Sequence, residues 1–388
     1  MSSKKISVVL VILLLIFGGI YTVKNYLINS PDDSIERLLS PPNNQKSNIT
    51  PESTPNEPAE RVQVIATNLN IPWDLDFFSD GSIIIVERPG TIKLLDKNLN
   101  PSTIFTISEV AHIGEGGLLG LAIHPDFENN QFIYFYYTYR RGFSILNKVV
   151  RFRYSSENFT DETIIIDNIP GAVRHNGGRI DFGPDGNLYI TTGDANNTQL
   201  AQQVDSLAGK ILRLTDSGGV PDDNPFGNEV YSYGHRNPQG LAWDNMGRFW
   251  ATEHGSSAFD ELNLIEKGKN YGWPEIRGSE TRSGMEAPII HSGNSTWAPS
   301  GSTFLNNSLY FTGLRGSTLY EATPLDNDLT FIKQNLKLNE YFYREFGRLR
   351  TVITGPDNLL YIITSNRDGR GSPTSDDDKL LKVNPNKL

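Results

Sequence analysis

Four ionisable side chains lie at nearly the same distance before a predicted tight turn. Each is 10 to 14 residues upstream of the turn residue: Glu115 before Asn129, His175 before Gly186, Arg236 before Gly247, and Arg348 before Asn358. An imidazole suits proton transfer near neutral pH, and arginine binds anionic groups through paired hydrogen bonds. Taken singly, each could equally be an ordinary surface or turn residue. Together they predict one site, and three arginines (Arg236, Arg348 and Arg350) beside a histidine in a chain with a formal net charge of −10 indicate that its ligand is an anion.

The turns that follow these side chains belong to a repeat with steps of 48 to 61 residues. Glycine and asparagine readily adopt the positive φ that two-residue hairpin turns require. A strand, a turn and a second strand recur six times, with turns at Gly81, Asn129–Asn130, Gly186, Gly247, Asn306–Asn307 and Asn358. A third strand follows in every copy, and a fourth in five of them, at Phe331–Gln334 in the fifth copy. The sixth copy lacks its fourth strand, which Val62–Ala66 is predicted to supply.

This repeat predicts an all-β fold, a six-bladed β-propeller of four-stranded blades. An N-terminal strand that completes the last sheet would close the ring and remove two exposed edges. A two-sheet sandwich explains neither the sixfold count nor the steady period. In a propeller, the loops leading into the inner strands surround one mouth of the central channel. The four ionisable side chains are therefore expected to converge there.

The N-terminus has a different character from the repeat. Lys4 and Lys5 precede an apolar run, Ile6–Val23, which predicts a transmembrane or signal helix with its N-terminus in the cytoplasm. No Ala-x-Ala-like cleavage site follows, so an uncleaved signal anchor is favoured over a removed signal. The bulk of the chain is then extracytoplasmic, anchored to the membrane, or secreted if the signal is cleaved. The predicted domains are a signal anchor (1–29), a disordered Pro/Ser/Asn-rich linker (30–60) and the propeller (61–388).

Composition narrows the chemistry. The chain has no cysteine, which excludes disulfides, thiolate metal sites and cysteine nucleophiles. A metal would have to be held by oxygen or imidazole, which favours calcium. No Lys/Arg-rich stripe is present, so a nucleic-acid partner is not expected.

At these same residues the chain resembles the soluble quinoprotein sugar dehydrogenases, a family that binds pyrroloquinoline quinone (PQQ) on a six-bladed propeller. The similarity spans nearly all of residues 61–388 in family order. The matching stretches are EGGLLGLAIHPDF (115–127), HNGGRIDFGPDG (175–186), YITTGD (189–194), GHRNPQGLAW (234–243), EHGSSAFDELNLIEKGKNYGWP (253–274), APSG (298–301) and GRLRTVITGPDN (347–358).

The resemblance implies a role for each matching residue. His175 would be the general base that takes the hydroxyl proton at the sugar's anomeric carbon. Arg236, with Asn237, would lie beside the quinone carbonyl that receives hydride. The residues expected to surround the cofactor are Glu115, Arg315, Arg348 and Arg350, with Arg315 replacing a family lysine.

The resemblance also implies two calcium ions and a sugar site. The carbonyls of Gly255 and Ser256 would hold one calcium beside the cofactor, and Glu261 and Tyr271 would belong to a second, structural site. Asp260 and His254 would line the substrate site. His254 stands where the glucose-oxidising members have glutamine, so the identity of the sugar stays open.

The predicted function is PQQ- and calcium-dependent oxidation of an aldose sugar to its lactone, with an external electron acceptor. Two alternatives remain at this point: a calcium-dependent propeller lactonase or other hydrolase, and a non-catalytic binding module at the cell surface. Lactonase-type sites hold a central ion with carboxylate and asparagine side chains, whereas the residues in phase here are mainly histidine and arginine. The sugar, the acceptor and the oligomeric state are not indicated by the sequence.

Overall fold

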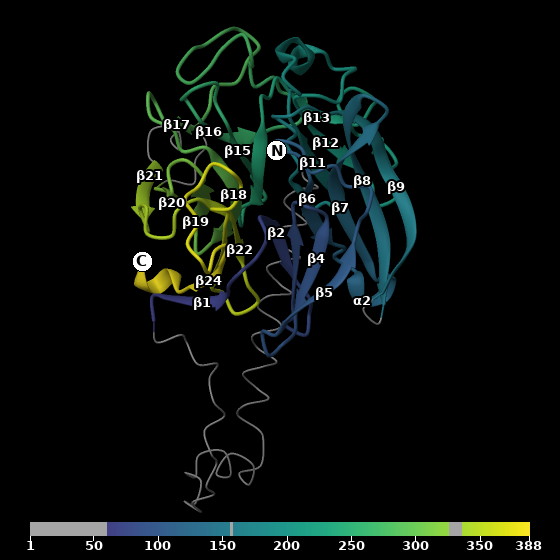
Figure 1. Ribbon diagram of the computed structural model, residues 1–388. Helices are drawn as coiled ribbons and strands as arrows, with labels where there is room; N and C mark the ends of the chain where they lie inside the picture. Colours follow the sequence, from purple (N-terminus) through teal and green to yellow (C-terminus); the bar gives the residue numbers. More distant parts are fainter. Residues whose placement is uncertain (1–59, 156–157, 326–335) are drawn as a thin grey trace, which may run out of the picture. The chain divides into compact units, whose positions relative to one another are not determined.

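The computed structural model describes residues 60–155, 158–325 and 336–388. These residues form six antiparallel sheets of four strands each (Figure 1). In five sheets the strands follow one another in chain order from the inner to the outer edge. The predicted six-bladed propeller with four-stranded blades is confirmed.

The strands of the first blade are β2 (Pro72–Phe77), β3 (Ile83–Glu87), β4 (Thr91–Leu95) and β5 (Pro101–Thr106). Those of the second are β6 (Leu118–Ile123), β7 (Phe132–Arg141), β8 (Ser144–Ser155) and β9 (Asn158–Pro170). The third has β10 (Ile180–Phe182), β11 (Leu188–Thr192), β12 (Lys210–Leu214) and β13 (Val230–Tyr233). The fourth has β14 (Pro238–Trp243), β15 (Phe249–Glu253), β16 (Glu261–Ile265) and β17 (Ile290–His291). The fifth has β18 (Pro299–Leu305), β19 (Ser308–Gly313), β20 (Thr318–Pro324) and β21 (Leu336–Tyr341). The sixth has β22 (Leu349–Thr354), β23 (Leu360–Thr364), β24 (Leu380–Val383) and β1 (Val62–Ala66). The short helices are α2 (Phe127–Asn130), η1 (Thr198–Gln202) and η2 (Pro385–Lys387).

The sixth blade is completed by the strand that precedes the first blade. β1 pairs antiparallel with β24, with Val62 opposite Val383 and Val64 opposite Leu381. The sheet order β1-β24-β23-β22 therefore places the outermost strand of the ring at the N-terminal end of the described chain. The predicted ring closure by Val62–Ala66 is confirmed.

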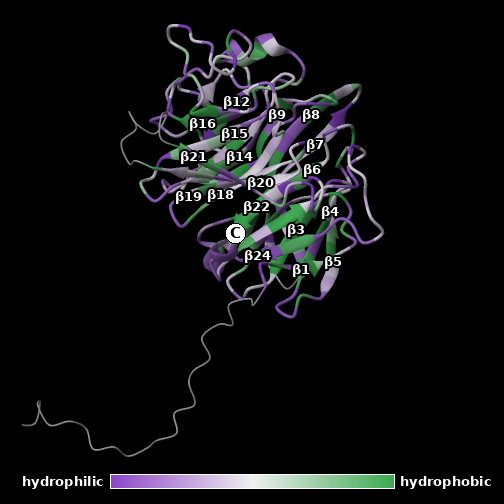
Figure 2. Cartoon of the chain, turned by 90° about the vertical axis from the view of Figure 1, so that its left-hand side faces the viewer, coloured by the Kyte–Doolittle hydropathy of each residue, from purple (hydrophilic) through white to green (hydrophobic). Residues whose placement is uncertain are grey.

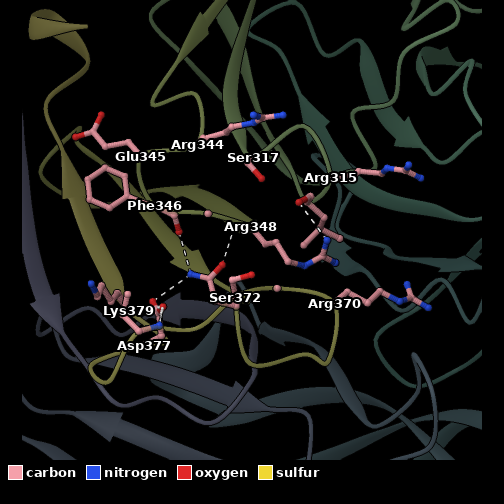
Figure 3. Close-up of a pocket in the computed structure, with 15 residues that line it drawn as sticks. Arg315, Ser317, Arg344, Glu345, Phe346, Arg348, Arg370, Ser372, Asp377 and Lys379 are labelled. Carbon is pink, nitrogen blue, oxygen red and sulfur yellow. Dashed lines mark hydrogen bonds between the residues drawn. The ribbon is translucent and has the colours of Figure 1, made fainter.

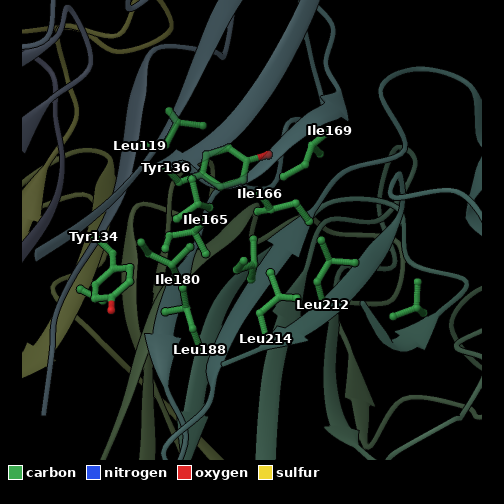
Figure 4. Close-up of a cluster of buried hydrophobic side chains, with 14 of the residues drawn as sticks. Leu119, Tyr134, Tyr136, Ile165, Ile166, Ile169, Ile180, Leu188, Leu212 and Leu214 are labelled. Carbon is green, nitrogen blue, oxygen red and sulfur yellow. The ribbon is translucent and has the colours of Figure 1, made fainter. Parts of the chain in front are cut away.

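Apolar side chains hold the blades to one another rather than filling one central core. Six buried clusters lie at the six interfaces between neighbouring blades, including that between the sixth and the first. Figure 4 shows the cluster in which Tyr134, Ile165 and Ile166 of the second blade meet Leu188 and Leu212 of the third. Because a blade is covered on both faces, its middle strands are buried along their length, and hydrophilic residues concentrate in the loops (Figure 2).

One predicted turn differs from the structure, and two predicted segments lie outside the described residues. The turn predicted at Asn129–Asn130 is wrong: these residues end helix α2, and the positive φ falls on Gln131 (φ 58°). Phe331–Gln334 lies outside the described residues, and the fourth strand of the fifth blade is β21. The predicted N-terminal helix and linker also lie almost wholly outside them. Within the described part of the chain, no helix is long and apolar enough to cross a membrane.

Ring closure by β1 can be tested by truncation. A chain that begins at Glu60 keeps β1, whereas a chain that begins at Leu69 lacks it and leaves an edge of β24 unpaired. We expect the longer chain to be soluble and folded, and the shorter one to aggregate and to melt at least about 5 °C lower. Calorimetry and size-exclusion chromatography measure the two effects. Equal melting temperatures would show that the ring does not need β1.

Candidate active site

The loops between successive blades and the loops joining the second and third strands of a blade lie at the same end of the ring. They enclose a cavity of about 340 Å³. Nine residues predicted from the sequence to form the site line it: Glu115, His175, Arg236, His254, Gly255, Ser256, Asp260, Arg315 and Arg348. The structure thus brings together the four ionisable side chains that share a phase in the repeat. Four further predicted residues are not in its lining: Asn237, Glu261, Tyr271 and Arg350.

A buried carboxylate fixes the orientation of His175. Nδ1 of His175 lies 2.8 Å from Oδ1 of Asp194, whose side chain is fully buried. Trp273 Nε1 donates to the other oxygen of Asp194 at 2.9 Å, which holds that carboxylate in place. A carboxylate at this distance requires the proton on Nδ1 and leaves Nε2 as the free acceptor. The imidazole of His175 is therefore prepared to receive a proton.

The backbone at His175 is held in the left-handed region, with φ 59°. Its N–H donates to Glu115 Oε2 at 3.0 Å, and Arg370 Nη1 donates to Glu115 Oε1 at 2.7 Å. Burial tends to raise the pKa of Glu115, but these two donors outweigh it and hold the pKa at about 2. Arg88 donates to the carbonyls of the glycines on either side of Glu115. Glu115 thus ties the loop of His175 to the loop of Arg370.

Arg236 lies against the loop that carries the predicted calcium ligands. Its Nη1 donates to the carbonyl of Gly255 at 2.6 Å, and its guanidinium lies 5.3 Å from the ring centre of Trp273. The backbone N–H of Arg236 donates to the buried carboxylate of Glu253. Next to it, Asn237 Oδ1 accepts from the N–H of Gly177 at 3.0 Å. Asn237 therefore positions the turn that follows His175.

Two arginines at the start of the inner strand of the sixth blade, Arg348 just before β22 and Arg350 within it, share one carboxylate. Arg348 donates from Nε and Nη2 to Asp368 Oδ2 at 3.1 and 2.8 Å, and Arg350 Nη2 is 3.9 Å from the same oxygen. Burial lowers the pKa of Arg350 to about 9, against the opposing charge of Asp368. Arg315, in contrast, is exposed, and its guanidinium has no partner among the described residues.

Three buried nitrogens of the predicted site residues lack hydrogen-bond partners: Nε of Arg236, Nε of Arg350 and Nε2 of His254. A buried donor without a partner costs free energy and therefore indicates a missing ligand or water. Two of the three belong to guanidinium groups, so the ligand they suit is an anion. Burial lowers the pKa of His254 to about 4, so this imidazole is neutral at pH 7.

The carboxylate of Asp260 is fully used within the protein. It accepts from the N–H of Gly255, from the hydroxyl of Thr296, and from the backbone N–H groups of Trp297 and Ala298, all at 2.7–2.8 Å. These bonds join the loops that follow β15 and β17. Contact between Asp260 and a substrate stays a prediction.

Glu261 and Tyr271, the residues predicted for a second calcium, lie outside the lining of the cavity. Burial and the charge of Glu253 raise the pKa of Glu261 to about 8. The Tyr271 hydroxyl donates to the carbonyl of Leu264 at 2.6 Å, and the ring stacks on His235. No group of three or more His, Asp or Glu side chains suited to a metal occurs in the described residues.

Comparison with known proteins places this geometry in a family. The family model for glucose/sorbosone dehydrogenases matches residues 69–380, which is most of the chain. The chain belongs to the glucose/sorbosone dehydrogenase family.

Relatives of this dehydrogenase cover nearly its whole propeller. It is 33% identical over 358 residues to the aldose sugar dehydrogenase YliI of Escherichia coli, covering 84% of this chain and 92% of that one. The PQQ-bound aldose sugar dehydrogenase of Streptomyces coelicolor is 39% identical with a TM-score of 0.77, covering 83% and 97%. A glucose dehydrogenase-type oxidoreductase of Thermus thermophilus is 42% identical with a TM-score of 0.78, covering 83% and 99%.

Several residues that support the site are not among those predicted from the sequence. The carboxylate partner of His175 is one, and the others are Arg88, Trp273, Asp368 and Arg370. Asp194 carried a usable signal, because it follows the second strand of its blade in the stretch YITTGD. Arg370 carried none, since it lies in the middle of a long loop, residues 365–379, between the second and third strands of the sixth blade.

The role of Glu115 in holding the dehydrogenase site can be tested through pH. A carboxyl with a folded-state pKa of about 2 stabilises the fold above its ordinary value of 4.5, and this stabilisation is lost as the pH falls toward 2. We expect Glu115→Gln to lower the free energy of unfolding by about 1–3 kcal/mol at pH 7, and by progressively less below pH 4.5. Urea denaturation at several pH values measures this. The exposed Glu162→Gln is the control, and a pH-independent difference would contradict the assignment.

Proposed function

We propose that the protein oxidises an aldose at its anomeric carbon to the lactone, with PQQ as cofactor and an external electron acceptor. The observation that carries the proposal is one cavity lined both by a proton acceptor, His175, and by Arg236, whose buried Nε has no partner. PQQ-bound and quinoprotein sugar dehydrogenases among the relatives support it.

The residues present fit the cofactor. PQQ is a planar quinone that bears carboxylates, and arginine pairs with carboxylates through two parallel hydrogen bonds. Arg315, Arg348 and Arg350 would hold those carboxylates, and Glu115 would keep Arg370 and the His175 loop in place beside them. When bound, the cofactor supplies the carbonyl that accepts hydride, which no side chain can do.

Proton transfer falls to His175. Its Nε2 would take the proton of the hydroxyl on the anomeric carbon while hydride leaves the same carbon, so that a C=O bond replaces the C–H and O–H bonds. Asp194, bonded to Nδ1, stabilises the imidazolium that forms. Arg236, with an unpartnered Nε, would stabilise the negative charge that develops on the cofactor.

Calcium is part of the proposal. Gly255 and Ser256 line the cavity, and their main-chain oxygens are hard ligands of the kind calcium binds. Arg236 already donates a hydrogen bond to the Gly255 carbonyl, so this oxygen would have to bind the ion as well, or the hydrogen bond would have to break. Two carbonyls are too few for a complete shell, and cofactor oxygens would supply further ligands. Glu261 and Tyr271 would serve a second, structural ion, Tyr271 through its carbonyl because its hydroxyl is engaged.

His254 and Asp260 would define the sugar site beside His175. A neutral His254 with a free Nε2 can bond a sugar hydroxyl without introducing charge. The alternatives of a lactonase and of a binding module are less well supported, because neither uses an oriented base beside a cluster of arginines. An extracytoplasmic location with an N-terminal membrane anchor (1–29) and a linker (30–60) completes the proposal.

The role of His175 separates catalysis from binding. In protein loaded with PQQ and calcium, His175→Ala should keep the cofactor while kcat falls by about 10²–10⁴, the usual loss for a general base. The wild-type rate should also fall at acid pH, because a protonated imidazole cannot accept a proton. Stopped-flow reduction of the bound cofactor by aldoses measures the chemical step directly. A wild-type rate in the loaded mutant would exclude His175 as the base, and a mere loss of melting temperature would indicate a structural histidine.

The proposed contacts of Arg348 and Arg350 with the cofactor can be tested by measuring cofactor binding alone. Arg348→Ala with Arg350→Ala should weaken PQQ binding by about 10²–10⁴-fold, because each buried charged hydrogen bond contributes roughly 1.5–3 kcal/mol. Titration calorimetry measures the affinity, and repeating it with a calcium chelator tests the need for the ion. Arg153→Ala, on an outer part of the second blade, is the control. Unchanged affinity in the double mutant would remove these arginines from the cofactor site.

A further inference from the structure

A second cavity adjoins the active-site cavity and shares part of its wall. It has a volume of about 580 Å³ and is formed by loops of the fifth and sixth blades (Figure 3). Leu314, Arg315, Arg348 and Arg370 line both cavities. In Figure 3 the guanidinium groups of these three arginines lie on one side, with Phe346 and Lys379 on the other. We call it the arginine cavity.

The arginine cavity is rich in basic side chains although the protein as a whole is acidic, and two of its shared arginines are paired, Arg348 with Asp368 and Arg370 with Glu115. Besides the three shared arginines it is lined by Arg344 and Lys379, and by only two acidic residues, Glu345 and Asp377. Asp377 is buried and spent on local bonds, since its oxygens accept from Asn366 Nδ2 and from the N–H and hydroxyl of Thr374. Lys379 pairs with the exposed Asp376 at 3.0 Å.

Of the cations that are not assigned to the cofactor, Arg344 is free to bind a further ligand. The guanidinium groups of Arg315 and Arg344 form no hydrogen bond or ion pair with the described residues; Arg344 lies only against the ring of its neighbour Tyr343. Ser317 and Ser372 add hydroxyl donors to the same wall. A solvent-filled space with this lining suits a small molecule that carries several negative charges.

The arginine cavity is not well placed to bind the sugar. His175, which the sugar must reach, lines the active-site cavity and does not line the arginine cavity. The arginines that would hold the cofactor form the shared wall between the two spaces. A molecule in the arginine cavity would therefore approach the bound cofactor from the side away from His175, without displacing the sugar.

We propose that the arginine cavity binds a small anionic electron acceptor, which reoxidises the enzyme after the sugar has been oxidised. The proposal rests on the proposed function. With a one-electron acceptor such as ferricyanide, one aldose and two ferricyanide ions give one lactone, two ferrocyanide ions and two protons. The protons pass to solvent, and the cationic wall raises the local concentration of the acceptor.

The test uses a double variant, Arg344→Asn with Lys379→Gln, which removes the two charges that the active-site cavity does not share. Asparagine suits position 344 because Arg344 has φ 59°. Lys97→Gln with Arg282→Asn, both exposed and outside either cavity, is the control with the same change in net charge. Ferrocyanide is the binding probe, and the protein is loaded with PQQ and calcium.

We expect ferrocyanide to bind the loaded wild-type protein in calorimetry, and the double variant to weaken that binding by about tenfold. The KM for ferricyanide should rise by about tenfold, and the KM for the cation hexaammineruthenium(III) should fall. Reduction of the bound cofactor by sugar, measured without acceptor, should be unchanged by the variant and by added ferrocyanide. The control should behave as the wild type in each measurement.

Other results overturn the proposal. Ferrocyanide binding to the cofactor-free protein but not to the loaded protein would show that the cofactor itself fills the arginine cavity. Slower sugar-driven reduction by ferrocyanide would place the anion at the sugar site. A variant that loses only the oxidation of acidic sugars, such as glucuronate, would make the cavity a substrate site. If no aldose reduces the bound cofactor, the proposed function fails, while the binding measurement still decides whether the cavity takes an anion.

Discussion

The antiparallel pairing of β1 with β24 joins the first and last strands of the described chain in one sheet and so closes the ring that carries the site. Each blade is stabilised by apolar clusters shared with the blades on either side, so an open ring would leave two blades with one uncovered face each. The site is assembled from loops of successive blades and has no framework of its own. Its geometry is therefore only as well defined as the ring that carries those loops.

The sequence predicts the ring better than it predicts the site. Gly or Asn at each hairpin turn is a local signal, since few other residues adopt the required φ, and it marked five of the six turns correctly. It failed at Asn129–Asn130, where a hydrogen bond from Gln131 to the carbonyl of Phe127 closes a helical turn instead. The repeat also gives no sign that β7, β8 and β9 reach 10, 12 and 13 residues, because this extension has no counterpart in the other copies.

Within the site, a shared position in the repeat was enough to predict that four side chains line one cavity: Glu115, His175, Arg236 and Arg348. The same phase says nothing about which carboxylate faces which cation. Asp194 reaches His175 from the loop that follows the second strand, and Asp368 reaches Arg348 from a long loop of the sixth blade. Such pairings depend on loop conformations that no spacing encodes. The resemblance to a family supplied roles for single residues, but not these supporting contacts.

The carboxylates and the arginines of the site differ in how they are used. The carboxylates hold the loops around the cavity together, whereas several arginine nitrogens have no partner. Glu115, Asp194, Glu253 and Asp260 are each bonded to backbone or side-chain donors of the loops around the cavity. The arginines keep unused nitrogens, and burial makes the retention of positive charge on Arg350 costly. Proteins commonly give up stability at sites that bind ligands, and this cluster is such a place.

The register of the sixth blade has a consequence for attaching the protein to something else. β22 begins at the cavity and each later strand reverses direction, so Val383 and its partner Val62 lie at the end of the ring opposite the site. Residue 60 and the C-terminal η2 leave the ring there. A fusion partner or a surface linker joined at either position would leave the mouth of the site facing outward. On an electrode, the enzyme would then present both of its cavities to the solution rather than to the support.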